Sequence, residues 1–172
     1  MQNKSILRNL IALTLIPGLG SKRVRHLVQE CDQLENLFNL SKTQLRSFEG
    51  VGEATALAIL SFDDWESVDQ QIEDTEKIGA QIITMRDPEY PNLLKEIYDP
   101  PILYWLKGDP EALKKPGVAI VGTRNASTYG KKQAEKFTTK LAEEGLCIFS
   151  GLAYGIDTIG HQSALNVGAT TV

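Results

Sequence analysis

One stretch of the sequence carries side chains that could bind a phosphate. It reads VAIVGTRNASTYGKK over residues 118–132, where a short apolar segment runs into a glycine, an arginine, small polar residues and then lysines. Arg124 could donate paired hydrogen bonds to a phosphate, and a helix that begins near Ser127 would add free amide N–H groups and partial positive charge. The alternative is a structural ion pair between Arg124 and an acidic residue. We favour the anion site, because α/β sheets bind ligands at the carboxyl ends of their strands.

The glycine spacing of this loop argues against a dinucleotide. A dinucleotide-binding fingerprint needs G-x-G-x-x-G and an acidic residue after the second strand. Here Arg124 stands where the second glycine belongs, and Ser150 and Gly151 follow the second strand in place of the acid. The sequence therefore predicts a phosphate site without a dinucleotide. Its candidate ligands in this segment are Gly122, Thr123, Arg124, Ser127, Lys131 and Lys132.

A second segment, SGLAYGIDTIGH at residues 150–161, follows the neighbouring strand. It should therefore face the first loop across the same crevice. Its glycines suggest a tight backbone close to a ligand or to another loop. The candidate binding residues here are Ser150, Gly151, Tyr154 and Gly155.

Asp157 and His161 lie four residues apart on a predicted helix, so they share one face. Such a pair could act as a general base. The simpler interpretation is structural, with Asp157 capping the helix and His161 bonding to it or to a loop carbonyl. We prefer the structural role, because no nucleophile or set of metal ligands accompanies the pair. The sequence predicts no catalytic residue and no metal site.

Two short segments near the amino terminus resemble each other. They read IPGLG at residues 16–20 and FEGVG at residues 48–52, and the offset of 32 residues favours a duplicated helix–turn–helix unit. A Gly-x-Gly turn before a helix can bind a phosphate, but both turns could equally be tight connectors in a small bundle. The first turn is rich in bases and the second in acids (Glu49, Glu53). We assign a secondary phosphate contact to Gly18, Gly20, Lys22, Arg23 and Arg25, and a packing role to Gly50 and Gly52.

The elements that must position these residues fall into a helical part and a mixed part. Apolar residues recur at helical spacing in ILRNLIALTLI and RHLVQECDQLENLF, so residues up to about 60 should be all helix. An acidic helix between residues 61 and 80 should close this part. Strands are predicted at residues 80–85 and 102–106, with a proline-rich segment between them.

From Val118 the pattern predicts a βαβαβ unit. The expected elements are a strand at 118–121, a helix at 128–144 with Ala134, Phe137 and Leu141 on one face, a strand at 146–149, a helix at 156–167 and a strand from 169. The fold class is α/β: a Rossmann-like parallel sheet preceded by a small all-α domain of the helix-hairpin-helix or SAM-like type. We place the domains at residues 1–79 and 80–172. Because the sequence stops inside the third strand, we expect the sheet to be incomplete and the chain to be part of a longer protein.

Composition sets further bounds. The chain has 172 residues and a net charge of −4, but the acidity is local. The segment at residues 61–80 holds seven of the 22 acids and one of the 18 bases, which leaves 15 acids against 17 bases elsewhere. Cys31 and Cys147 show no pairing or metal spacing, which suits a reducing, cytoplasmic setting. No apolar run reaches the length of a membrane span, so we expect no membrane partner.

Three of these segments together resemble a known family. YPNLLKEIYDPPILYWLKG, VAIVGTRNASTYG and SGLAYGIDTIGHQSAL are similar to the DNA processing protein family, DprA, also called Smf, over roughly residues 90–172. The helical part resembles the helix-hairpin-helix or SAM-like domain that many members carry. The resemblance implies a protein that binds single-stranded DNA, forms a homodimer and loads the RecA recombinase onto incoming DNA in natural transformation. It implies no catalytic turnover and no cofactor.

The chain departs from the family pattern at two positions. The family usually has Gly-Ser-Arg, and Thr123 keeps the hydroxyl of that serine. Many members have an arginine before Gly-Ile-Asp, where this chain has Tyr154. That change removes one possible phosphate contact and supplies an aromatic ring that could stack on a base.

An enzyme is the competing hypothesis. A Rossmann-like nucleotide hydrolase related to the lysine-decarboxylase-like family would need a glycine-rich loop with a nearby catalytic glutamate. The sequence up to Val172 contains no such loop. Free base released from a nucleoside monophosphate would distinguish this enzyme from a DNA-binding protein.

Overall fold

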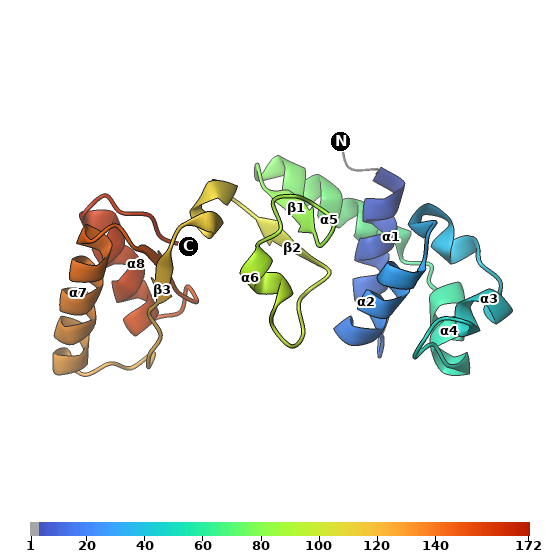
Figure 1. Cartoon of the computed structure of the whole chain (residues 1–172), viewed down its shortest axis with the longest axis horizontal. Coiled ribbons are helices and arrows are strands. Elements are labelled where there is room, and N and C mark those ends of the chain that lie inside the picture. Colours follow the sequence, from blue (N-terminus) through green and yellow to red (C-terminus); the bar gives the residue numbers. More distant parts are fainter. Residues whose placement is uncertain (1–3) are drawn as a thin grey trace. The chain divides into compact units, whose positions relative to one another are not determined.

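The computed structural model describes residues 4–172 and divides into two compact units, Met1–Gly108 and Asp109–Val172 (Figure 1). Each unit has its own hydrophobic core. No helix among the described residues is long and apolar enough to cross a membrane. The fold is of the predicted class, a small helical domain followed by a parallel sheet with helices packed on it.

Among the described residues, the helical part of the first unit contains five α-helices and one 3-10 helix. They are α1 (Lys4–Leu15), α2 (Ser21–Glu30), η1 (Leu34–Asn39), α3 (Lys42–Arg46), α4 (Glu53–Leu60) and α5 (Trp65–Lys77). The helical spacing of RHLVQECDQLENLF does not correspond to one helix, because α2 ends at Glu30 and η1 begins at Leu34. The spacing persists across the break because Leu27 and Leu34 enter the same core from two different elements.

The two Gly-x-Gly turns have the same backbone geometry. Gly18 and Gly50 both have φ of +76°, in the left-handed region that favours glycine. In each turn the residue after that glycine is buried and donates its N–H back to the residue before the turn, over 3.2 Å. The second glycine, Gly20 or Gly52, is extended and immediately precedes the next helix. The repeated sequence thus builds a repeated turn.

We expect Gly50→Val to lower the free energy of unfolding by about 1–3 kcal/mol, because a β-branched residue is strained at this φ. A Cβ at this position would meet only Arg23 Cγ at 3.7 Å, an ordinary contact, so the cost is conformational. Gly50→Asn is the matched control, since asparagine tolerates the left-handed region. Urea titration measures both variants, and a Gly50→Val midpoint equal to that of the wild type would refute a packing role for this turn.

The acidic segment forms the predicted helix, α5, and is fastened to α1 by Arg8. Its guanidinium donates to both carboxylate oxygens of Asp69, at 2.6 and 2.8 Å, and lies 5.1 Å from the centre of the Trp65 ring. The hydrogen bond from Arg8 lowers the pKa of the Asp69 carboxyl. Trp65 also packs edge-on against Phe38 and Phe62, which joins the start of α5 to the helical core.

Two short strands complete the core of the first unit. β1 (Gln81–Thr84) pairs antiparallel with β2 (Leu103–Leu106), and α6 (Asn92–Lys95) lies between them in sequence. Both strands were predicted, and their apolar side chains, such as Ile82 and Leu103, pack into the same core as the helices. The compact unit therefore extends to Gly108. The domain division between residues 79 and 80, at the change from helices to strands, stays a prediction.

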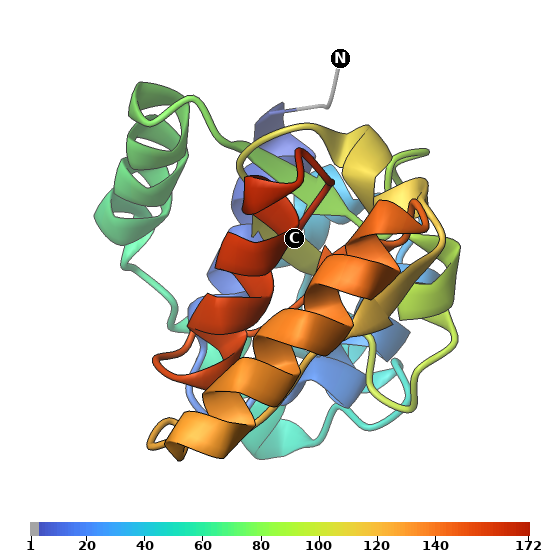
Figure 2. The same cartoon turned by 90° about the vertical axis from the view of Figure 1, so that its left-hand side faces the viewer.

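The second unit has the predicted βαβαβ order. After η2 (Pro110–Lys114) come β3 (Gly117–Ala119), α7 (Thr128–Glu143), β4 (Cys147–Phe149) and α8 (Ile156–Asn166). β3 and β4 are parallel, and Ile148 of β4 forms a parallel bridge with Thr171, so the strand order follows the sequence. Such an order with right-handed crossovers places both helices on one face of the sheet. Figure 2 shows α7 and α8 side by side.

Ala134, Phe137 and Leu141, which the sequence places on one face of α7, differ in burial. Ala134 and Leu141 are half-buried, whereas the side chain of Phe137 is 60% exposed. The buried face instead centres on Thr138 and Ala142. Because successive residues are 100° apart on a helix, a shift of one position is enough to turn Phe137 away from the core.

Candidate nucleic-acid interface

The loops that follow β3 and β4 touch each other at the carboxyl end of the sheet. The N–H of Ile156 donates to the carbonyl of Thr123 over 3.3 Å. At Gly155 the backbones approach so closely that an added Cβ would lie 2.3 Å from the Thr123 oxygen and 2.5 Å from the Arg124 oxygen. The predicted juxtaposition of the two segments is therefore present, and the contact is between backbones.

Two other glycines of the predicted site are explained by packing within the protein. A Cβ on Gly122 would lie 2.6 Å from a side-chain carbon of Ile156, so this glycine lets α8 approach β3. The N–H of Gly151 donates to Asp157 Oδ2 over 3.1 Å, and a Cβ there would lie 2.9 Å from the same oxygen. The N–H of Gly151 is therefore engaged by a carboxylate, which bears against a phosphate contact there.

The three aliphatic hydroxyl groups of the candidate site, those of Thr123, Ser127 and Ser150, also have internal partners. Ser127 caps α7 as expected, since its oxygen accepts the N–H of Gly130 over 3.1 Å. Thr123 Oγ1 accepts the N–H of Asn125 over 3.2 Å. Both can still donate a proton to a ligand. The hydroxyl of Ser150, in contrast, donates to the Ile120 carbonyl over 2.6 Å and holds the two strand ends together.

Arg124, Lys131 and Lys132 are exposed and form no ion pair with any residue in the part of the chain that the structure describes. The structural ion pair considered as the alternative for Arg124 is therefore not formed. The first turn of α7 also contains no acidic residue. These cations and the free N–H groups at the start of α7 bring positive charge to this loop, and none of the cations is ion-paired with a described residue.

Two apolar side chains of the second loop point into solvent. Tyr154 is 84% exposed and Leu152 is 85% exposed. Leu152 also has φ of +54°, the one non-glycine residue with positive φ among the described residues. Leu152 was not predicted as part of the site. A leucine rarely adopts a left-handed backbone, so the sequence gives no sign of this conformation.

The expected contacts of Asp157 and His161 are not formed. Asp157 does not cap α8, whose N-cap residue is Gly155 without a side-chain cap bond. His161 bonds neither to Asp157 nor to a loop carbonyl. Its Nδ1 lies 2.7 Å from Thr171 Oγ1. Since the Thr171 hydroxyl donates to the Ile148 carbonyl, Nδ1 must carry the proton of this bond. Asp157 is buried and clamps the loop through Gly151.

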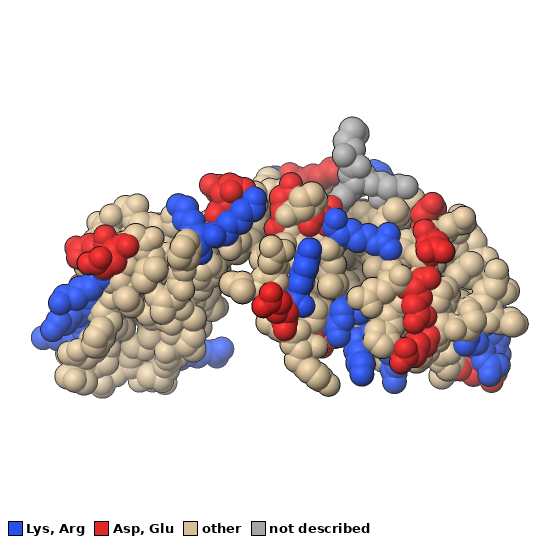
Figure 3. All heavy atoms as spheres, viewed as in Figure 1, with Lys and Arg blue, Asp and Glu red and all other residues tan. Residues whose placement is uncertain are grey.

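The cations at the first amino-terminal turn are partly engaged. Figure 3 shows basic side chains gathered over α2, which follows this turn. Arg25 donates to Asp99 Oδ1 at 2.6 Å and to the Pro100 carbonyl at 2.9 Å, and its side chain is only 13% exposed. Hydrogen bonds from Ser21 and Arg25 lower the pKa of the Asp99 carboxyl. A phosphate would have to displace this ion pair to reach Arg25.

Of the remaining two cations of this turn, one has a hydrogen-bond partner and the other has none among the described residues. Arg23 donates to the Gly18 carbonyl over 3.0 Å, which stabilises the turn itself. Lys22 is exposed and has no partner among the described residues. At the second turn Lys42 pairs with Glu53 at 2.6 Å and lowers the pKa of that carboxyl. The secondary phosphate contact at this turn stays a prediction, and Lys22 is its cation without a partner among the described residues.

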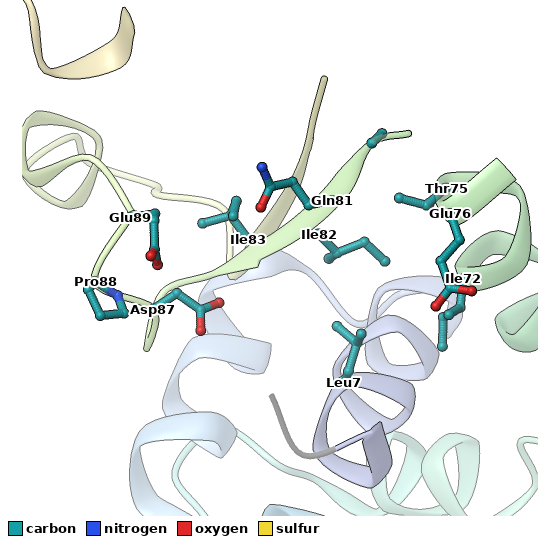
Figure 4. Close-up of a pocket in the computed structure, with 11 residues that line it drawn as sticks. Leu7, Ile72, Thr75, Glu76, Gln81, Ile82, Ile83, Asp87, Pro88 and Glu89 are labelled. Carbon is teal, nitrogen blue, oxygen red and sulfur yellow. The ribbon is translucent and has the colours of Figure 1, made fainter. Parts of the chain in front are cut away.

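A pocket of about 490 Å³ lies beside β1, between that strand and helices α1 and α5 (Figure 4). Leu7 and Ile72 form an apolar wall, and the carboxylates of Glu76 and Glu89 lie at opposite sides. The negative charge of this pocket disfavours a nucleic acid. No group of three or more potential metal-ligating side chains occurs in residues 4–172.

Comparison with known proteins shows two matching family models. Residues 81–172 match the DNA recombination-mediator protein A model, and residues 10–74 match a SAM-like helix-hairpin-helix tandem. Protein Smf of Synechocystis is 33% identical over 166 residues, which is 94% of this chain and 42% of that protein. DNA processing protein DprA of Streptococcus pneumoniae is 49% identical over 86 residues, covering 50% of this chain and 30% of that protein.

A solved structure is similar over nearly the whole chain. The X-ray structure of DNA processing protein A from Streptococcus pneumoniae superimposes with a TM-score of 0.74 at 29% identity, covering 99% of this chain and 57% of that one. The chain spans less than half the length of the two curated relatives.

Proposed function

Because the chain belongs to the DNA recombination-mediator protein A family, whose model covers its whole parallel sheet, we propose that it binds single-stranded DNA. The binding surface is the pair of loops at the carboxyl end of β3 and β4. The observation that carries the proposal is the exposed guanidinium of Arg124, which has no carboxylate partner in the described chain and lies just before the start of α7. A backbone phosphate is the ligand that such a group fits.

The choice of a single strand rests on the second loop. Tyr154 presents an almost fully exposed ring within a loop that contacts the Arg124 backbone through Gly155. In a duplex the bases are paired and stacked on each other, whereas an unpaired base can stack on an aromatic side chain. The Streptococcus pneumoniae relative is named a DNA processing protein, which agrees with a nucleic acid as the ligand.

The wider role that we propose is the one implied by the family resemblance. The full-length protein forms a homodimer in the cytoplasm, protects incoming DNA and loads RecA recombinase during natural transformation. It acts by binding, without catalytic turnover. Pull-down of RecA by the full-length protein, with and without single-stranded DNA, tests the partner, and sedimentation tests the dimer.

The direct test is a titration of the full-length protein into labelled single-stranded and double-stranded oligonucleotides, followed by fluorescence anisotropy. We expect tighter binding to the single strand and affinity that falls linearly with salt on logarithmic axes. Equal affinity for the duplex would contradict the assignment to single strands. Release of free base from a nucleoside monophosphate would support the hydrolase instead.

A further inference from the structure

The exposed face of α7 carries a row of three lysines, and only the first of them, Lys132, belongs to the candidate phosphate site. Lys132, Lys136 and Lys140 follow each other at intervals of four residues, so they lie on one face about 6 Å apart along the helix axis. Tyr129 lies on the same face, one turn before Lys132, and is 73% exposed. We call these four residues the α7 stripe.

The charge of the α7 stripe is not compensated within the protein. Residues 123–140 contain five basic residues and one acidic residue, Glu135. None of the three stripe lysines forms an ion pair with a described residue, whereas Lys77 on α5 pairs with Glu73 and Asp74. Figure 3 shows basic side chains along the flank of α7 and acidic ones at its carboxyl end. Like charges four residues apart destabilise a helix, so the row costs stability in the free protein.

Aromatic rings accompany these lysines. Tyr129 lies within the stripe, and Phe137 lies beside it with 60% of its side chain exposed. Alternating cations and exposed rings are the combination that binds single-stranded nucleic acid, because the cations follow the phosphates and the rings stack on unpaired bases. A double-stranded ligand would use the lysines but not the rings.

The stripe is continuous with the proposed phosphate site. α7 begins directly after the loop that holds Arg124, and its 16 residues extend for about 24 Å. We propose that the exposed face of α7 continues the single-stranded DNA track, with the three lysines contacting successive phosphates beyond the one at Arg124 and Tyr129 stacking on a base between them. This inference rests on the proposed function and adds to it the path that the single-stranded DNA follows along α7.

The test uses the full-length protein with the triple substitution Lys132→Gln, Lys136→Gln and Lys140→Gln. Each phosphate contact contributes about 0.7 to the salt slope for a single strand, so the triple variant should lose about 2 units of slope. Over the decade of salt from 1 M to 0.1 M, that loss corresponds to about a hundredfold weaker binding at 0.1 M. The melting temperature should change little, because less repulsion among the lysines offsets the loss of the favourable charge of Lys140 in the last turn of α7.

Oligonucleotide length separates a track from a general charge effect. We expect the full loss with oligonucleotides of about 16 nucleotides and only the loss due to Lys132 with about 4 nucleotides, which fill only the loop site. Lys77→Gln is the control for net charge and should leave both affinities unchanged, since acidic partners surround that lysine.

The outcomes distinguish the two proposals. If the wild type binds no single-stranded DNA, the proposed function fails and this inference with it. If the wild type binds and the triple variant keeps the wild-type slope at both lengths, the α7 track alone is wrong. Equal weakening at both lengths would also overturn it, since a strand that does not reach the helix would then respond to the lysines.

Discussion

Replacing Gly155 with alanine is expected to abolish binding of single-stranded DNA and to destabilise the second unit. Gly155 has φ of +88°, and its added Cβ would lie 2.3 Å from the Thr123 oxygen and 2.5 Å from the Arg124 oxygen. Both neighbours are backbone atoms, so they cannot rotate away. The unfavourable φ costs about 1–3 kcal/mol and overpacking about 1–3 kcal/mol more. Relief of the clash would push the Arg124 loop away from α8 and displace the guanidinium.

Gly145→Ala is the matched control for this substitution. Gly145 has nearly the same φ, +84°, but no atom lies within 4 Å of its added Cβ. We therefore expect Gly145→Ala to lower the free energy of unfolding by about 1 kcal/mol, from the unfavourable φ alone, and to leave DNA binding unchanged. Thermal unfolding and anisotropy report the two effects separately. Equal melting temperatures for the two variants, with DNA binding intact in both, would show that the loops are not held together at Gly155.

Replacing Arg124 with alanine is expected to weaken single-stranded DNA binding by roughly 10- to 150-fold. The estimate follows from about 1.5–3 kcal/mol for a hydrogen bond to a charged group, at tenfold for each 1.4 kcal/mol. The loss should be similar for different base sequences, because a phosphate contact reads no bases. The salt slope should flatten by about 0.7, the share of one phosphate. Anisotropy of labelled oligonucleotides over a series of salt concentrations gives both quantities.

Tyr154→Ala is the comparison that separates charge from stacking. Loss of one stacked base costs about 1–3 kcal/mol of binding free energy. We therefore expect the Tyr154→Ala variant to bind single-stranded DNA more weakly by about 1–3 kcal/mol. Its salt slope should stay close to that of the wild type, since stacking on an uncharged ring releases no counterions. An Arg124→Ala variant that binds weakly but keeps the wild-type slope would make Arg124 a structural residue and would refute the phosphate assignment.

Features that depend on neighbours along the chain were determined by the sequence. The glycines of the repeated turns predicted two turns with one geometry, because only a residue without a Cβ adopts φ of +76° at little cost. The alternation of apolar runs and helical spacing predicted the βαβαβ order of the second unit. Ser127 predicted the start of α7, because a serine hydroxyl satisfies a free N–H at a helix end.

Features that depend on contacts between distant residues were decided by the tertiary structure. Arg25 and Asp99 are 74 residues apart in sequence. No local pattern could therefore show that Arg25, a predicted phosphate contact, is already paired with a carboxylate. Likewise, Gly122 is explained by its approach to Ile156 on another helix. The exposure of Phe137 depends on which side of α7 faces the sheet, a choice that a helical period leaves uncertain by one residue. Sequence periodicity describes one element at a time, whereas burial and pairing arise only when two elements pack.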